Sequence, residues 1–97
     1  MSRLSDEQVA EALAGSPWER DGDAIVREWR LEGFTAAIAF VDRVAEAAES
    51  AGHHPDILVH GYDRVRLTLS THSQGGITEA DLALARRIDG LAAARGG

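Results

Sequence analysis

The turn that organises this chain reads Glu49-Ser50-Ala51-Gly52-His53-His54-Pro55-Asp56. Gly52 suits the left-handed backbone position that follows a helix, and Pro55 prevents that helix from continuing. His53 and His54 are therefore predicted to lie on a turn between a helix and a strand.

The chain continues into the alternating pattern Val65-Arg66-Leu67-Thr68-Leu69, which predicts a strand covered by helices on one face. It then passes His72 and reaches Asp81 at the beginning of another helical pattern. All four histidines fall within residues 49–81, and three of them, His53, His54 and His72, lie at element boundaries where side chains can converge. Because imidazole exchanges a proton near neutral pH, this cluster with nearby carboxylates indicates acid-base chemistry.

The residues before this stretch predict a helix, two strands and a longer helix. A helix is expected over residues 4–15, where Ser5 and Gln8 have capping-box spacing. Strands at 18–20 and 25–31 flank a tight turn. Arg27 interrupts the apolar face of the second strand, and we expect its stem to pack and its head to reach water. The helix over residues 34–51 carries an i, i+3, i+4 series of Phe34, Ala37, Ile38, Val41, Val44, Ala45 and Ala48.

The residues after the turn predict a second hairpin and a last helix. Strands at 57–59 and 64–71 surround the turn at 60–63, and a helix runs from 78 to about 94. Its inward positions are Leu84, Ala85, Ile88, Leu91 and Ala92. The order α-β-β-α-β-β-α predicts an α+β fold, with a four-stranded antiparallel sheet and helices packed on one face. Residues 1–97 are expected to form a single domain.

Composition limits the classes of function. A chain of 97 residues, 44% hydrophobic, has little room for a deep cleft, so we expect a homodimer or homotetramer. The net charge of −6 argues against a nucleic-acid partner. No cysteine is present, so disulfides and thiolate metal sites are excluded. The N-terminus is polar and no apolar run approaches the ~20 residues of a membrane span, so we expect a cytoplasmic protein without a membrane partner.

The motifs resemble the pterin-4a-carbinolamine dehydratases, also called 4a-hydroxytetrahydrobiopterin dehydratases. The resemblance rests on three runs: Glu49-x-x-x-His53-His54-Pro55-Asp56, Val65-x-Leu67-x-Leu69-Ser70-Thr71-His72, and Gly76-Ile77-Thr78-x-x-Asp81-x-x-Leu84-Ala85. Trp18, the strand Ile25-x-Arg27-x-Trp29-x-Leu31 and Phe34-x-x-Ala37-x-x-Phe40 extend it to nearly the whole chain. Ile57, Gly52 and Ala80 depart from the family pattern.

The resemblance implies dehydration of a 4a-hydroxytetrahydropterin to the quinonoid dihydropterin, in tetrahydropterin recycling. That reaction needs an acid for the departing hydroxyl and a base for a ring-nitrogen proton, and paired imidazoles suit both without a cofactor. By resemblance, His53 and His72 match the acid-base histidines, and His54 matches a residue that holds the pterin. Glu49, Pro55, Asp56 and Asp81 match positions at the substrate site, where a carboxylate could orient an imidazole or bind the amino-pyrimidine edge.

Several residues have a structural alternative. Asp81 has capping-box spacing with Thr78, so it could cap the last helix, and this role is compatible with one in the site. Glu49 could be a solvated carboxylate, and His60, outside the motifs, is expected to be a surface residue. Adjacent His53 and His54 should project in different directions, which fits chelation of one ion poorly, so no metal is expected.

A rival function belongs to another class. Proteins that resemble this family also serve as protein-binding modules, as a dimerisation cofactor of a transcription factor or as a Rubisco assembly chaperone. Such modules need the fold and its surface but not an intact histidine set. The presence of His53, His54 and His72 therefore favours the enzyme.

Overall fold

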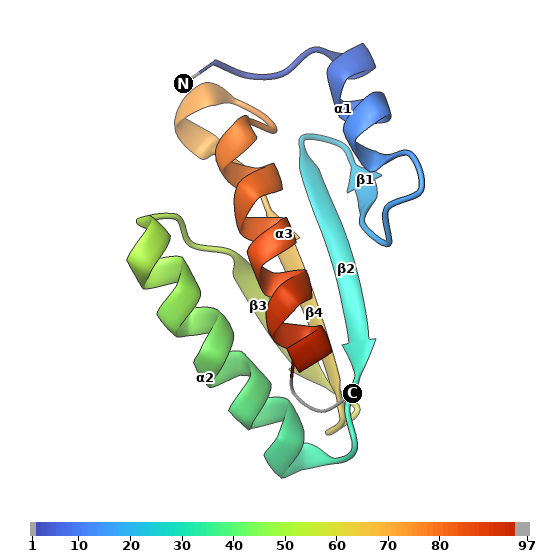
Figure 1. Ribbon diagram of the computed structural model, residues 1–97, viewed down its shortest axis with the longest axis vertical. Coiled ribbons are helices and arrows are strands. Elements are labelled where there is room, and N and C mark those ends of the chain that lie inside the picture. Colours follow the sequence, from blue (N-terminus) through green and yellow to red (C-terminus); the bar gives the residue numbers. More distant parts are fainter. Residues whose placement is uncertain (1, 95–97) are drawn as a thin grey trace.

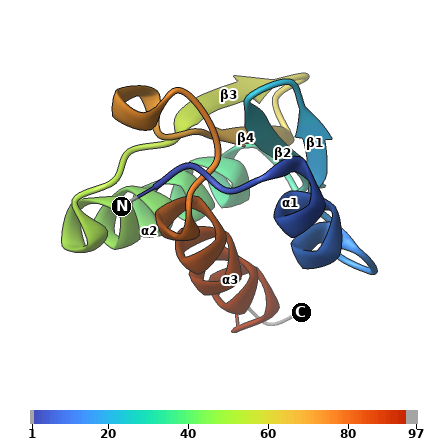
Figure 2. The same ribbon diagram turned by 90° about the horizontal axis from the view of Figure 1, so that it is seen from above.

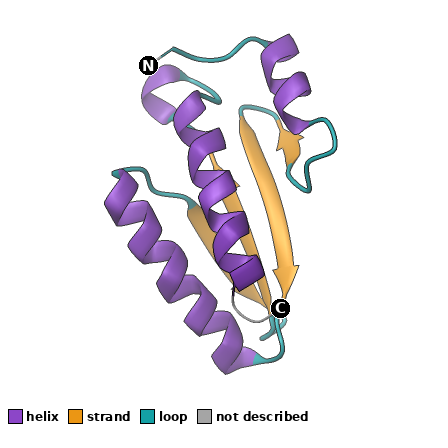
Figure 3. Cartoon of the chain, in the orientation of Figure 1, coloured by secondary structure: helices purple, strands orange, loops and turns teal. Residues whose placement is uncertain are grey.

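The computed structural model describes residues 2–94, which form two β-hairpins and three helices (Figures 1 and 3). In chain order, the elements are α1 (Asp6–Leu13), β1 (Glu19–Asp21), β2 (Ala24–Arg30), α2 (Phe34–Ala51), β3 (Asp56–His60), β4 (Arg64–Leu69), the 3-10 turn η1 (His72–Gln74) and α3 (Glu79–Ala94). The predicted α-β-β-α-β-β-α order is confirmed. Residues 1 and 95–97 of the predicted 1–97 domain lie outside the described part.

The four strands form one antiparallel sheet in the order β1-β2-β4-β3, so the two hairpins join through their second strands. Ile25 lies opposite Leu69 and Trp29 opposite Val65, and all four side chains are buried on the same face. Figure 2 shows α2 and α3 side by side beneath this face, with α1 on the same side near β1. The α+β fold with helices on one face is therefore confirmed.

Helix α2 buries a different stripe from the predicted one. Its buried residues are Ala37, Phe40, Val44, Ala47 and Ala48. Phe34 is 57% exposed and Ile38 is 38% exposed, so the prediction was wrong in including them in the inward face. The apolar series on this helix is wider than the stripe that the sheet and α3 cover, so part of it remains at the surface.

Arg27 is also placed differently from the prediction. Its side chain is 24% exposed, and its Nη1 donates to Asp89 Oδ1 at 2.6 Å instead of reaching freely into water. Trp18 Nε1 donates to the same oxygen at 2.8 Å, and the Arg27 guanidinium lies 4.5 Å from the centroid of the Trp29 ring. This cluster fastens α3 to β2 and to the segment before β1.

Strand β4 ends at Leu69, two residues earlier than predicted. Thr71 leaves the ladder because its backbone N–H and C=O pair with Gly76 across a short loop, at 2.9 and 3.3 Å. The residues between them turn as η1, which carries His72. The loop after β4 therefore places His72 near the start of α3 rather than at a strand end.

Candidate active site

The end of α2 presents His53 and His54 as the sequence predicts. Gly52 is left-handed at φ 63°, and its N–H bonds the carbonyls of Ala48 and Glu49. The N–H of His53 also donates to the Ala48 carbonyl, at 3.1 Å. These bonds close the helix, so that the two histidines follow immediately and Pro55 leads into β3. In Figure 1 this turn, η1 and the first turn of α3 lie at one end of the molecule.

Asp81 joins three of these segments through one buried carboxylate. Its side chain is 0% exposed. Oδ1 lies 2.5 Å from His53 Nε2, while Oδ2 accepts from Thr71 Oγ1 at 2.8 Å and from the Thr78 backbone N–H at 2.9 Å. A carboxylate only accepts hydrogen bonds, so His53 donates from Nε2 and its Nδ1 is left to act as an acceptor when the ring is neutral.

Asp81 caps α3 as well as binding His53. Thr78 Oγ1 accepts from the Ala80 N–H at 3.2 Å, and the Thr78 N–H in turn donates to the Asp81 carboxylate. Thr78 and Thr71 hydroxyls lie 2.8 Å apart, which completes a chain of donors leading to Asp81. One carboxylate oxygen of Asp81 therefore caps α3, and the other contacts His53, a predicted site residue.

Glu49 holds His54. His54 Nε2 bonds Glu49 Oε2, and both side chains are largely exposed. The sequence left Glu49 as either a solvated or a site carboxylate, and the structure makes it the partner of a predicted site histidine.

His72 lies exposed on η1, one residue after the Thr71 that binds Asp81. Within residues 2–94, its imidazole forms no hydrogen bond, so both ring nitrogens remain available.

The N-terminal segment braces this loop. Leu4 N–H donates to the Ile77 carbonyl at 2.8 Å, and the Arg3 side chain crosses Gly76 so closely that a Cβ there would lie 2.5 Å from Arg3 Cδ. Sequence reasoning missed this brace, since only the paired glycines hint at close approach.

The remaining predicted residues are less closely tied to the histidines. Pro55 is half-buried in the turn, and Asp56 is exposed at the start of β3, opposite Thr68. His60 pairs with Glu28 at 2.7 Å on the sheet, in keeping with a surface position. Among residues 2–94, no three histidine or acidic side chains gather as a metal site.

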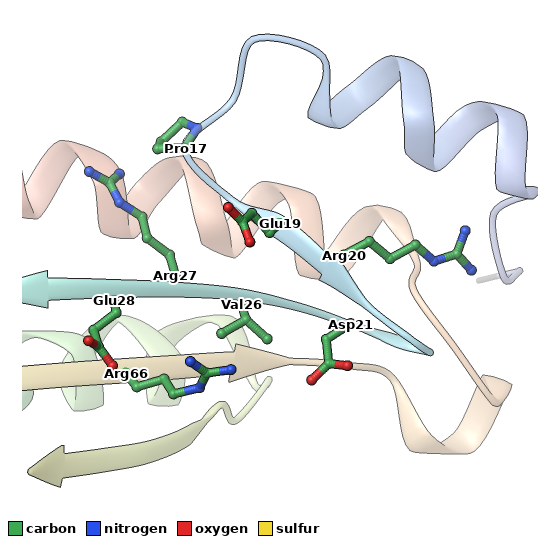
Figure 4. Close-up of a pocket in the computed structure, with 8 residues that line it drawn as sticks. All are labelled: Pro17, Glu19, Arg20, Asp21, Val26, Arg27, Glu28 and Arg66. Atoms are coloured by element: carbon green, nitrogen blue, oxygen red, sulfur yellow. The ribbon is translucent and has the colours of Figure 1, made fainter.

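Two of the hollows at the surface bear on where a substrate could bind. One of about 240 Å³ adjoins His53. A larger one, of about 690 Å³, lies by β1 and β2 and is shown in Figure 4. Its lining is mostly charged and contains no histidine: Pro17, Glu19, Arg20, Asp21, Val26, Arg27, Glu28 and Arg66. Of the predicted site histidines, His53 therefore lines the first hollow, and none lines the larger one.

Taken together, the fold and site define an α+β protein whose candidate site holds two imidazole–carboxylate pairs and, on His72, an imidazole without a partner within residues 2–94. The family model described as Pterin 4 alpha carbinolamine dehydratase matches residues 2–91. The chain belongs to this family.

Relatives of known sequence support this assignment. A protein of Nocardia farcinica is 61% identical over 92% of this chain and 94% of its own length. One of Thermomicrobium roseum is 55% identical over 95% of this chain and 99% of its own. Both carry the name "Putative pterin-4-alpha-carbinolamine dehydratase".

Two solved structures share the fold. A transcriptional coactivator/pterin dehydratase from Brucella melitensis has a TM-score of 0.87 and 35% identity, covering 94% of this chain and 99% of that one. A pterin dehydratase-like protein identified as a RuBisCO assembly factor in the alpha-carboxysome has a TM-score of 0.62 and 29% identity, covering 77% of this chain and 86% of that one. No helix within residues 2–94 is long and apolar enough to cross a membrane.

Proposed function

We propose that this chain dehydrates a 4a-hydroxytetrahydropterin to the quinonoid dihydropterin, in the cytoplasm, as part of tetrahydropterin recycling. The observation that carries the proposal is the 2.5 Å contact between His53 and the fully buried Asp81. The contact holds the His53 imidazole beside a loop that carries the imidazole of His72, which has no partner within residues 2–94.

The reaction requires one proton to be given and one to be taken. The C4a–O bond breaks as the hydroxyl receives a proton and leaves as water. The neighbouring ring nitrogen loses its proton as a C=N bond forms. No electron is gained or lost, so we propose that imidazoles suffice without metal or other cofactor.

We assign the base to His53 and the acid to His72. With Nε2–H held by Asp81, His53 has Nδ1 free to take the ring-nitrogen proton, and the carboxylate stabilises the imidazolium that results. His72, exposed and unpaired within residues 2–94, can turn toward the hydroxyl. His54, held by Glu49, is assigned to holding the pterin, with Pro55 and Asp56 beside it.

Stopped-flow dehydration of freshly generated 4a-hydroxytetrahydropterin tests this proposal. His53→Ala and His72→Ala should each lower turnover by roughly 10²-fold or more, the usual scale for a general acid or base. His60→Ala, which removes an imidazole paired with Glu28, is the matched control and should leave turnover unchanged. Wild-type protein that gives no acceleration over buffer would refute the enzyme.

We further propose that the chain forms a homodimer or homotetramer. Phe34 and Ile38 project from α2 beside a hollow of about 310 Å³, and Leu58 is exposed on the edge strand β3. Apolar side chains on a helix flank and a sheet edge are typical of surfaces that partners cover. Light scattering after gel filtration should give a multiple of the 10.4 kDa chain, and Phe34→Asp should reduce it.

A protein-binding role is the second candidate. It is favoured by the fold shared with the RuBisCO assembly factor and by the same exposed residues on α2. Native mass spectrometry with candidate partner proteins would distinguish the two functions. A binding module should form a complex with its partner even as the His53→Ala/His72→Ala variant, whereas a protein that is only an enzyme should form no such complex.

A further inference from the structure

Apart from His53 itself, the residues that line the hollow beside His53 have no part in the proposed chemistry. It lies between the end of α2 and one face of α3, and its lining residues are Ala51, His53, Ala80, Ala83, Leu84 and Arg87. Three alanines and a leucine make its walls apolar. His53 and Arg87 supply its only charged or titratable side chains.

The size of this hollow suits part of a ligand. At about 240 Å³ it is smaller than the roughly 300–1,000 Å³ of sites that enclose whole ligands. Since His53 belongs to its wall, a ring bound for proton transfer at His53 would bring its own substituent to this hollow. The hollow is therefore a subsite for the group that the ring carries.

The chemistry of the walls selects among substituents. A polyol chain would place its hydroxyls against alanine and leucine side chains, which offer no hydrogen bond, so desolvating them would cost free energy. An aromatic or aliphatic group loses nothing there and removes apolar surface from water.

Arg87 determines what the far end of the substituent should be. Its guanidinium has no ion-pair or hydrogen-bond partner within residues 2–94. The neighbouring Arg86 does not line the hollow and is instead paired with Glu79 at 3.4 Å. Arginine binds carboxylates through two parallel N–H donors, so an unpaired arginine at the margin of an apolar hollow favours an anionic terminus.

We propose that this subsite recognises a pterin substituent that is aromatic or aliphatic along its length and ends in a carboxylate bound by Arg87, as in a p-aminobenzoylglutamate chain, rather than a short polyol. The proposal rests on the proposed function, because it places the ring at His53. It makes Arg87 a specificity-determining residue.

Calorimetric titration with three dihydropterins tests this assignment. The probes are 7,8-dihydrofolate, 7,8-dihydrobiopterin and 6-methyl-7,8-dihydropterin. Wild type should bind dihydrofolate most tightly, and Arg87→Gln should weaken that binding about three- to tenfold while changing the 6-methyl compound less than twofold. Arg86→Gln removes an equal charge one residue away and should change neither.

A second variant tests the apolar walls. Ala83 is exposed, so Ala83→Leu should leave folding intact while filling the hollow. It should weaken dihydrofolate more than the 6-methyl compound. Binding of all three pterins with no dependence on Arg87 or Ala83 would overturn the subsite alone, whereas no pterin binding to wild type would overturn the proposed function with it.

Discussion

Replacing Asp81 separates its two roles, because the carboxylate serves the helix cap through Oδ2 and His53 through Oδ1. In Asp81→Ala both are lost. The Thr71 and Thr78 hydroxyls, 2.8 Å apart, can still share one bond, so three donors lose an acceptor: the buried Thr78 N–H, one of the two hydroxyl protons, and His53 Nε2–H.

The structure sets the size of the loss. An unsatisfied buried donor costs about 1–3 kcal/mol, and His53, 16% exposed, recovers part of this from water. We therefore expect Asp81→Ala to lower the free energy of unfolding by about 2–4 kcal/mol. For a domain of this length, that lowers Tm by about 10–25 °C.

Asp81→Asn should behave differently. Its amide oxygen can replace Oδ2 and keep the bonds from Thr71 and Thr78, so stability should fall by no more than about 1 kcal/mol. Its NH₂ then faces His53, whose Nε2 must accept, so the ring proton moves to Nδ1. The base proposed here would then carry a proton where it needs a lone pair, and turnover should fall roughly 10²-fold or more.

Three measurements on wild type, Asp81→Ala and Asp81→Asn check this reasoning: urea unfolding, stopped-flow turnover, and ¹⁵N NMR of the His53 ring nitrogens. Glu46→Gln, at an exposed carboxylate on α2, is the matched control and should change none of them. The reasoning is refuted if Asp81→Asn moves the His53 proton to Nδ1 and yet keeps wild-type turnover. In that case Asp81 would be a cap alone.

Three further outcomes are expected. Gly76→Ala should lower turnover a few-fold, because its Cβ would lie 2.5 Å from Arg3 Cδ and displace the Arg3 side chain from the His72 loop. In an Arg3→Ala background, Gly76→Ala should lower turnover almost no further. An equal loss of turnover in both backgrounds would exclude a role for Arg3 in holding the loop. Gly52→Ala should destabilise the protein by about 1–2 kcal/mol in urea unfolding, because Gly52 has φ 63°, whereas Gly33→Ala, at an extended and open position, should be nearly neutral. Dialysis against EDTA should leave turnover unchanged, and a loss restored by a divalent ion would contradict a reaction run by imidazoles alone.

The elements that could be predicted from the sequence are those with local signals. Helix α2 begins and ends where predicted, because Gly52 and Pro55 are chemical stops whose effect does not depend on the rest of the fold. The Ser5–Gln8 capping box of α1 is present for the same reason. The η1 turn was missed because it depends on pairing between Thr71 and Gly76, which an alternating strand pattern does not reveal.

Contacts between distant segments could not be predicted. The spacing of Thr78 and Asp81 predicted a cap, but nothing in it indicates that the second oxygen of Asp81 meets His53, 28 residues away. Arg27 was predicted to reach water because strand alternation shows which face of the sheet a side chain lies on, but not which side chain it meets there. Its partner, Asp89, is 62 residues away in the sequence. In both cases the local pattern placed a residue within its element, and the packing of α3, against the end of α2 for Asp81 and against β2 for Asp89, decided which side chain lay opposite.

The arrangement at Asp81 also bears on how enzyme and binding module can be told apart within this fold. Capping α3 uses only Oδ2 of Asp81, so a module without catalysis would still gain stability from that residue. The bond between Oδ1 and His53 adds little to stability, because a water molecule could replace it at this partly exposed ring. The His72 imidazole forms no hydrogen bond within residues 2–94, so it does not stabilise the fold in that way. An aspartate at position 81 is therefore explained by stability alone. Stability alone does not explain His53 and His72, and the assignment of catalysis depends on these two residues.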